Sequence, residues 1–365
     1  MTIDDGIILE YRIKKLLFHL GYFSRNHLTL RSYFYPEVID VTDIDALGVK
    51  FSSNFNCEMV ICECKTGDSD GTVDRILWLA GLSGYFSTTS AMIVKKSIPS
   101  KIKRFAQEVG ITPIDYARLK EIEKTNGRPD VFLGSNDYEY YEPKLREYYQ
   151  FLKDDAHLAK IYWFLRSQYW YSQNSTRMKK TLTALKMLSA NPKFKAGQWL
   201  TYEATTLFSL SLVYLCKELF PLSDKERPEY INNLLITGLV SPDYSRKILG
   251  AAYGLIASKS LGNRTGGQNR GLSKIKRPTP DYAPALIDLI ERMVQRPSIS
   301  AEVPRFMDFL FFEYLFKQKA IDEKIVRELF PFDTQYIAKM SKNVVKFIIE
   351  TSNISEELFK SLNDF

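Results

Sequence analysis

The chain has 365 residues, of which 45% are hydrophobic and 25% are charged, and its formal net charge is +7. This length favours more than one domain, and the composition supports sizeable cores and argues against global disorder. The mild positive charge is compatible with a polyanionic partner but is found in many proteins without one. No run of about 18 apolar residues occurs, and the acidic N-terminal start lacks the basic region of a secretion signal. We therefore expect a cytoplasmic protein without a membrane partner.

The sequence contains four cysteines and three histidines. Three of the cysteines lie close together, at positions 57, 62 and 64. Cys62 and Cys64 are two apart in an apolar strand pattern, and no fourth ligand follows at the spacing of a zinc site. We interpret these cysteines as small buried side chains that stay reduced. No two histidines stand at metal-ligand spacing, which disfavours a His-rich metal site and a Ser-His-Asp hydrolase.

The N-terminal third alternates between helical and extended patterns. Residues 5 to 20 form an amphipathic pattern that predicts a helix, and a polar connection is expected at 48 to 56. Strands are predicted at 28–35, 38–47, 58–64, 91–94 and 111–114, with helices at 73–86, 99–109 and 115–124. This order predicts a mixed sheet flanked by helices, and hence an α/β domain over residues 1–124.

Beyond this domain the pattern becomes helical. Residues 125–142 are rich in Gly, Pro, Asn and Asp and are interpreted as a linker. Helical periodicity then recurs at 143–154, 156–171, 176–189, 198–218, 228–239, 243–258, 281–296, 302–318, 322–330, 333–350 and 354–363. We therefore expect a larger all-α domain over residues 143–365.

The most informative stretch is Val60-Ile61-Cys62-Glu63-Cys64-Lys65, an apolar strand that ends on a carboxylate and an ammonium. Side chains two apart in a strand point to the same side, so Glu63 and Lys65 share one face and the two cysteines share the other. Burying an acid and a base is costly without partners. The pair is therefore either a structural ion pair or holds something between its charges, such as a metal ion and a phosphate.

Further acids precede this strand. Asp43 and Asp45 occupy one face of the preceding strand, and Glu10 lies beside the apolar stripe of the first helix. Carboxylates facing the same way from neighbouring strands, about 4.8 Å apart, suit the oxygen ligands of Mg²⁺. Lys65 would then orient an attacking water or stabilise charge on a phosphate. For Glu10 the alternative is a solvated acid paired with Lys14.

The order of these acids along the chain resembles that of the PD-(D/E)XK nuclease superfamily. The residues that carry the resemblance are the helix acid Glu10, Asp45 within Thr42-Asp43-Ile44-Asp45-Ala46-Leu47-Gly48, and the strand end Glu63-Cys64-Lys65. The resemblance spans residues 5 to 120 and is nearest to the Mrr-like restriction endonuclease and Holliday-junction resolvase branches. It implies a restriction-endonuclease-like α/β core, with Asp45 and Glu63 as metal ligands and Lys65 as the catalytic lysine. Glu10 would be the helix carboxylate that holds metal-bound water. The implied cofactor is Mg²⁺, with Mn²⁺ as a substitute.

The chain departs from this family pattern in two places. No proline directly precedes Asp45, and Asp43 competes with Asp45 for the ligand role, although the small and apolar residues after Asp45 favour it. Some branches carry a glutamine in the helix after the motif, where this chain has Asp74 and Arg75. Arg75 is a candidate phosphate contact, with a solvated surface arginine as the alternative.

Two stretches of the helical part are candidates for binding nucleic acid. No acid occurs between Arg246 and Pro280, and the cations there, beside a Gly- and Asn-rich segment, are suited to phosphate contacts: Lys259, Arg264, Arg270, Lys274, Lys276 and Arg277. The alternative is a surface loop without a ligand. An aromatic stretch between Tyr138 and Tyr171 is suited to stacking on unpaired bases, but core packing is the commoner use of such residues.

Together these observations predict a metal-dependent endonuclease, a hydrolase of phosphodiester bonds with DNA as the expected substrate. A role in restriction or antiviral defence rests on family analogy alone. Two alternatives stay open, namely an RNA-directed nuclease of the same fold and a non-catalytic module that binds nucleic acid or another partner. The aromatic helices also offer a surface through which a homodimer could form.

Overall fold

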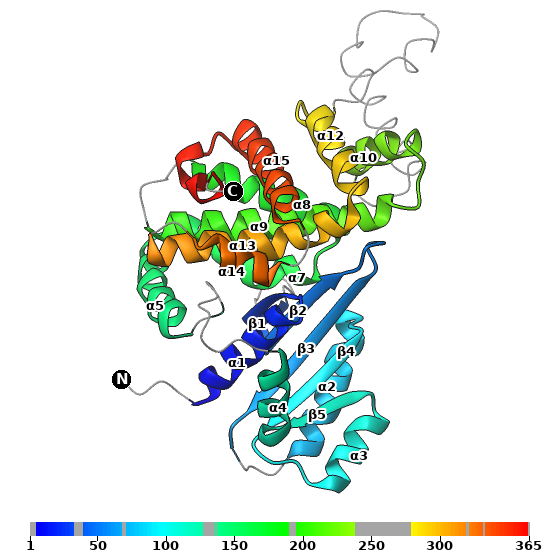
Figure 1. The fold of residues 1–365 in the computed structure, drawn as a ribbon, viewed down its shortest axis with the longest axis vertical. Coiled ribbons are helices and arrows are strands. Elements are labelled where there is room, and N and C mark those ends of the chain that lie inside the picture. The colour runs from blue at the N-terminus through cyan, green and yellow to red at the C-terminus, as the bar shows by residue number, and fades with distance from the viewer. Residues whose placement is uncertain are drawn as a thin grey trace, which may run out of the picture.

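The computed structural model describes residues 5–32, 39–67, 71–126, 136, 138–189, 195–237, 279–318, 321–330 and 333–363. A five-stranded mixed sheet with flanking helices forms the N-terminal part, and a mostly helical region follows it (Figure 1). The elements of the first part are α1 (Asp5–His19), β1 (Phe23–Ser32), β2 (Ile39–Phe51), β3 (Cys57–Lys65), α2 (Thr72–Phe86), β4 (Ser90–Lys95), α3 (Ser100–Glu108), β5 (Ile111–Asp115) and α4 (Tyr116–Asn126).

The strands lie in the order β1-β2-β3-β4-β5. β1, β2 and β3 pair antiparallel, whereas β3, β4 and β5 pair parallel. Helices α2 and α3 form the crossovers that the parallel pairs require. The predicted mixed sheet flanked by helices is therefore confirmed.

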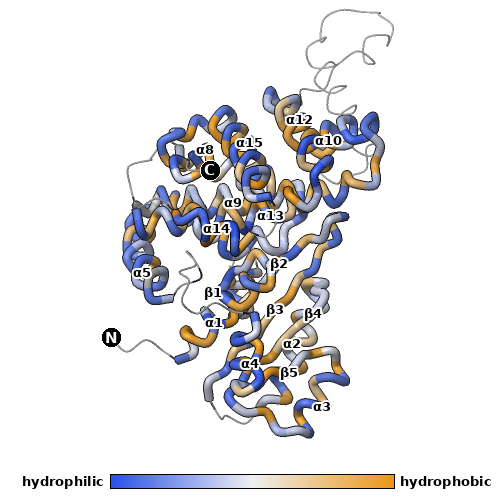
Figure 2. Tube along the Cα trace, in the orientation of Figure 1, coloured by the Kyte–Doolittle hydropathy of each residue, from blue (hydrophilic) through white to orange (hydrophobic). Residues whose placement is uncertain are grey.

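Each face of the sheet is covered by a different pair of helices. Leu9, Leu17 and Leu119 of α1 and α4 pack with Cys62 and Cys64 on one face. On the other face, apolar residues of α2 and α3 pack against the opposite side chains of the strands: Ile76, Leu79, Ala106, Ile61 and Ile93. The central strands are accordingly apolar along most of their length (Figure 2). Glu63 stands between these cysteines in the strand and faces the α2 side.

Two strand boundaries differ from the prediction. β1 begins at Phe23 rather than at residue 28, and β2 continues to Phe51, through the stretch expected to be a polar connection. Gly48 pairs with Ser24 and Val60 within the sheet. A glycine suits this position because a Cβ there would meet side-chain atoms of Val60 and Tyr22 at 3.0 and 3.1 Å. Since Val49 and Phe51 are also buried, the polar turn is confined to the residues after Phe51.

The expected linker at 125–142 is helical at both ends. α4 continues to Asn126, and α5 (Tyr138–Asp154) begins before the predicted residue 143. Tyr141 and Leu145, four residues apart, are both buried and extend the apolar stripe of α5 towards its N-terminus. Residues 127–135 and 137 lie outside the described residues.

The helical region is built around α9 (Lys195–Leu219), which lies beside α13 (Pro297–Lys317) (Figure 1). α9 is buried on nearly all sides, which marks it as the core of this region. The remaining elements are α6 (Ala156–Trp163), the π-helical turn η2 (Phe164–Gln168), α7 (Tyr169–Tyr171), α8 (Asn174–Ser189), α10 (Glu226–Thr237), α12 (Ala283–Val294), α14 (Glu323–Leu329), α15 (Thr334–Ser352) and the 3₁₀ helix η4 (Glu356–Leu362). The helix predicted at 243–258 lies outside the described residues.

A buried charge network joins the two parts. The guanidinium of Arg25 in β1 contacts Glu203 of α9 at 2.9 Å and Asp308 of α13 at 2.9 Å, and all three side chains are at most 2% exposed. Arg166 of η2 donates a hydrogen bond to the carbonyl of Asn26 at 3.0 Å. One continuous apolar core accompanies this network, so the sheet and the helical region pack as one body.

The expected core role of the aromatic stretch is confirmed for most of the residues that can be assessed. The side chains of Tyr141, Tyr148, Tyr162, Phe164, Tyr169 and Trp170 are buried. Phe151 is exposed, and Trp163 is partly exposed. In the described part of the chain, no helix is long and apolar enough to cross a lipid bilayer.

Candidate functional site

The end of β3 brings an acid and a base together on the α2 side of the sheet. Nζ of Lys65 lies 3.0 Å from Oε1 of Glu63, whose side chain is only 3% exposed, whereas that of Lys65 is 35% exposed. The predicted common face of these two residues is therefore confirmed. A buried carboxylate at the open end of a strand is placed to meet a ligand that the ammonium also reaches.

Asp45 stands next to this pair because of the strand register. Ala46 pairs with Cys62 across β2 and β3, which places Asp45 opposite Glu63 one residue further along. Oδ2 of Asp45 accepts a 2.7 Å hydrogen bond from the backbone N–H of Cys64 and lies 3.9 Å from Nζ of Lys65. Asp43 lies two residues further along β2, opposite Thr29 of β1, and is exposed. The structure thus brings Asp45, rather than Asp43, to Glu63 and Lys65.

Glu10 reaches the same region through His27. Oε2 of Glu10 lies 2.9 Å from Nδ1 of His27. His27 sits on β1 between residues that pair with Ala46 and Ile44, so it stands across from Asp45. Its φ of +52° is uncommon for a residue other than glycine, and strained residues of this kind gather at functional sites. Sequence reasoning missed His27 because only its strand position reveals it.

Glu10 contacts His27, whereas Lys14, its predicted alternative partner, lies beside Tyr141. Lys14 is buried, and its Nζ lies 4.7 Å from the ring centre of Tyr141, at the boundary with the helical region. Burial, and then the charge of Arg25, lower the pKa of Lys14 to about 7. Glu10 is therefore the acid of α1 that is directed towards the sheet end.

α2 adds a second cation beside Glu63. Nε of Arg75 lies 3.4 Å from Oε1 of Glu63, and the Arg75 side chain is 46% exposed. Lys95, which the sequence analysis did not single out, pairs in register with Lys65 and donates a 2.8 Å hydrogen bond to Thr72 of α2. Two cations thus contact one carboxylate, and a third stands on the neighbouring strand, an arrangement suited to binding a phosphate.

The carboxylates of the site influence each other. Burial, and then the negative charge of Glu63, raise the pKa of Asp45 to about 7, and Glu10 contributes in the same direction. Burial also raises the pKa of Cys64 well above its ordinary value, with further contributions from the charges of Asp45, Glu10 and Glu63. The three acids therefore act in the same direction on the thiol of Cys64 at the end of β3. Mutual repulsion of buried acids favours the binding of a cation or proton.

The carboxylates of Asp45, Glu63 and Glu10 are the kind of ligand that a hard cation prefers, but their present arrangement does not enclose one. Oε1 of Glu63 and Oε2 of Glu10 are buried and accept no well-directed hydrogen bond. Oε1 of Glu63 lies close to Nζ of Lys65, and Oε2 of Glu10 lies close to Nδ1 of His27. Among the described residues, no three His, Cys, Asp or Glu side chains stand close enough together to enclose a metal ion. Mg²⁺ keeps several waters and takes further oxygens from a phosphate, so two carboxylates suffice.

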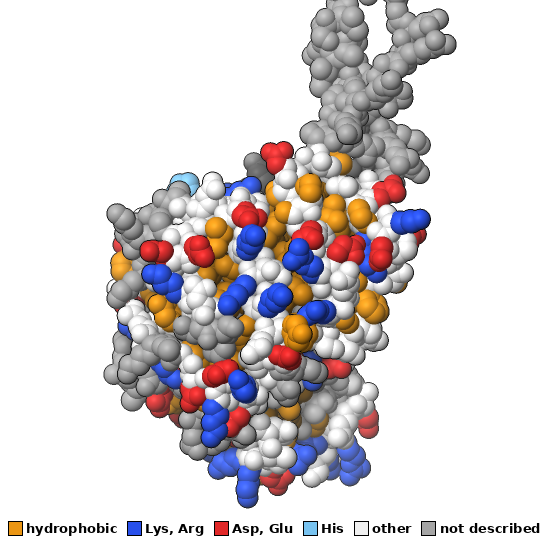
Figure 3. Space-filling model, turned by 45° about the horizontal axis from the view of Figure 1, so that its top comes forward, with side chains coloured by type: hydrophobic (Ala, Val, Ile, Leu, Met, Phe, Trp, Pro, Cys, Tyr) orange, Lys and Arg blue, Asp and Glu red, His pale blue; other side chains and the backbone are white. Residues whose placement is uncertain are grey.

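The other predicted contacts with nucleic acid are not placed by the structure. Lys259, Arg264, Arg270, Lys274, Lys276 and Arg277 all lie outside the described residues. On the face shown in Figure 3, lysine and arginine side chains are interspersed with acids over the helical region. Among the predicted nucleic-acid contacts, Arg75 is therefore the one that the structure places beside the site.

Comparisons of this chain with models of protein families, with curated proteins and with solved structures find no match.

Proposed function

We propose that this protein is a metal-dependent endonuclease that hydrolyses phosphodiester bonds in DNA, on a fold of the PD-(D/E)XK type. The observation that carries the proposal is the convergence of Asp45, Glu63 and Lys65 at one end of the sheet, with Nζ of Lys65 3.0 Å from Glu63 and 3.9 Å from Asp45. Two acids and a lysine arranged in this way are suited to metal-assisted attack of water on phosphorus. A role in restriction or antiviral defence is part of the same proposal by family analogy.

In the proposed reaction, the carboxylates of Asp45 and Glu63 would hold Mg²⁺, and Glu10 would orient a water beside them. When bound, the ion supplies a Lewis acid that neutralises charge on the phosphate and acidifies water. Lys65 positions the attacking water and stabilises the negative charge that develops on the phosphate oxygens. The water oxygen forms a bond to phosphorus and gives up one proton to solvent, while a phosphorus–oxygen ester bond breaks and the departing oxygen takes up a proton.

The cations around Glu63 also support a phosphate substrate. Lys65 and Arg75 both lie within 3.4 Å of one buried oxygen in the protein alone. If Glu63 held a cation instead, the side chains of Lys65 and Arg75 would be available to contact a phosphate.

The proposal is tested by incubating the protein with supercoiled plasmid, single-stranded DNA and single-stranded RNA in Mg²⁺, in Mn²⁺ and in EDTA. We expect cleavage of DNA with either metal and none with EDTA. Competition between labelled DNA and RNA in one reaction tests the RNA-directed alternative, which predicts faster loss of RNA. Absence of metal-dependent cleavage of every substrate contradicts the proposal.

A non-catalytic module that binds nucleic acid is the second candidate. It is favoured by the internal pairing of Glu63 with Lys65 and Arg75, which already compensates the buried acid. Such a module would bind DNA equally well in EDTA and in Mg²⁺ and would cut neither strand. Gel-shift titrations beside the cleavage assay therefore separate the two candidates.

A further inference from the structure

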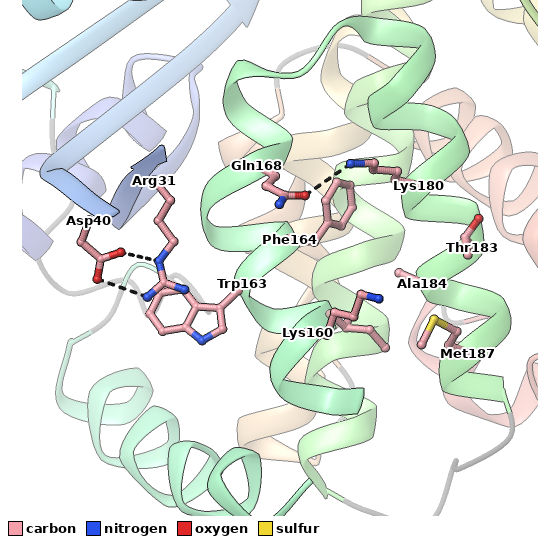
Figure 4. A pocket seen from close by; sticks show the side chains of 11 residues that line it. Arg31, Asp40, Lys160, Trp163, Phe164, Gln168, Lys180, Thr183, Ala184 and Met187 are labelled. Atoms are coloured by element: carbon pink, nitrogen blue, oxygen red, sulfur yellow. Dashed lines mark hydrogen bonds and ion pairs between the residues drawn. The ribbon is translucent and has the colours of Figure 1, made fainter. Parts of the chain in front are cut away.

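A pocket of about 640 Å³ lies between the outer end of the β1–β2 ribbon and the helical region (Figure 4). Arg31 and Asp40 line it from the ribbon, while Lys160, Trp163, Gln168 and Lys180 line it from α6, η2 and α8. This volume lies within the roughly 300–1,000 Å³ typical of small-molecule sites. The pocket shares no lining residue with the candidate catalytic site.

One wall of the pocket is a fixed aromatic plane. The guanidinium carbon of Arg31 lies 3.2 Å from the ring centre of Trp163, so the two flat groups stack. Asp40 holds the guanidinium in place by accepting hydrogen bonds of 2.6 and 3.2 Å from its Nε and Nη2 (Figure 4). Because the stack is held from two sides, little freedom is lost when a ligand packs beside it.

The charge of the pocket favours an anion. Arg31 is compensated by Asp40, the one acidic side chain that lines the pocket among the described residues. Lys180 donates a 3.3 Å hydrogen bond to the neutral Oε1 of Gln168, and the head group of Lys160 is exposed. Two positive charges therefore remain beside an apolar floor that includes Phe164 and Met187.

The π-helical turn explains why these residues meet. η2 runs from Phe164 to Gln168 and buries Arg166 against β1, where it donates to the carbonyl of Asn26. The same turn presents its first and last residues to the pocket. Single π-helical turns cost some hydrogen-bond geometry and recur at functional sites. Gln168 gains from this arrangement an amide that can both donate to and accept from a ligand edge.

We propose that this pocket binds one nucleotide unit, with the base on the apolar floor beside Trp163 and the phosphate near Lys160 and Lys180. A flat ring joined to an anion matches the aromatic wall, the amide of Gln168 and the two lysines together. The unit is either a free mononucleotide or one nucleotide of a single strand, since both have this chemistry. This inference goes beyond the proposed nuclease activity because it requires neither a metal nor Asp45 and Lys65.

The test measures binding in EDTA, so it is independent of cleavage. Equilibrium dialysis is carried out with radiolabelled AMP and UMP, with adenosine and inorganic phosphate as competitors, and fluorescence anisotropy is measured with a labelled six-residue oligothymidylate. The variants are Trp163→Leu and the double variant Lys160→Gln/Lys180→Gln, with Lys120→Gln on α4 as the matched control. Circular dichroism and melting curves check that each variant folds.

We expect both pocket variants to weaken binding about tenfold or more, as loss of a stacking partner or of phosphate contacts predicts, and Lys120→Gln to bind like the parent. If the parent binds AMP or UMP and the pocket variants do not, the ligand of the pocket is a free nucleotide. If the pocket variants lose binding of the oligonucleotide alone, the ligand is one nucleotide of a single strand.

Three results overturn the proposal: the parent binds neither probe, the variants bind as tightly as the parent, or phosphate competes as well as AMP. If Trp163→Leu does not fold, the lysine variant decides, because both of its altered head groups are exposed. If the parent protein binds the nucleotide probes in EDTA but cleaves no nucleic acid with metal, the nuclease proposal fails and the pocket proposal stands.

Discussion

The backbone N–H of Cys64 donates a 2.7 Å hydrogen bond to Oδ2 of Asp45, which ties β2 to the end of β3 at the candidate site. Asp43, two residues away on the same strand, is exposed. If Asp45 is a metal ligand, Asp45→Asn should reduce Mg²⁺-dependent cleavage about 100-fold or more, because a carboxylate ligand becomes a neutral amide. Asp43→Asn is the matched control and should cut within about threefold of the parent. The reverse pattern would assign the ligand role to Asp43.

Glu10 should act through the metal and its water rather than through folding. Glu10→Gln keeps the shape of the side chain but removes the charge beside His27. We expect the Mg²⁺ concentration for half-maximal cleavage to rise about 10- to 100-fold, the usual effect of losing a group that supports a metal site. Glu123→Gln, which breaks the outer pair with Arg12, is the control and should leave the Mg²⁺ requirement unchanged. An unchanged requirement in Glu10→Gln would remove Glu10 from the site.

The pKa of Asp45 predicts how stability depends on pH without metal. Because that pKa is raised from 3.8 to about 7, the folded protein binds more protons than the unfolded chain between these values. The resulting stabilisation is complete below about pH 4 and is lost as the pH rises through about 7. Urea titrations in EDTA from pH 5 to pH 8.5 should therefore show Asp45→Asn gaining stability relative to the parent as the pH rises. Parallel stability curves would contradict the raised pKa.

The network at the boundary between the sheet and the helical region should dominate stability. Arg25→Met removes the guanidinium that contacts the buried Glu203 and Asp308 and should lower the free energy of unfolding by about 3–5 kcal/mol. Arg12→Ala breaks a pair whose side chains are 30% and 28% exposed and should cost about 0–1 kcal/mol. Urea denaturation of both variants measures the difference. A loss below 1 kcal/mol in Arg25→Met would show that the interface does not depend on this arginine.

The elements with a local apolar pattern could be predicted from the sequence alone. Helix α1, the parallel strands and the common face of Glu63 and Lys65 follow from spacing alone. The sequence was not sufficient for Arg25, which lies outside the predicted strand at 28–35 and whose partner Glu203 stands 178 residues away. The same holds for Lys14, which is buried by Tyr141 and other residues of the helical region. His27 was missed because it lies before the predicted strand at 28–35, whereas the structure places it within β1.

Lys65 provides the most direct test of the proposed function. Its ammonium touches Glu63 and approaches Asp45, but its side chain is 35% exposed, so Lys65→Ala should fold as the parent does. Cleavage of supercoiled plasmid is measured in Mg²⁺ for the parent, Lys65→Ala and the α4 control Lys120→Ala, with melting curves for all three. The account predicts a loss of about 100-fold or more in Lys65→Ala, the scale of removing one group that stabilises the transition state, and none in the control. If Lys65→Ala cuts DNA as fast as the parent, the catalytic assignment is wrong.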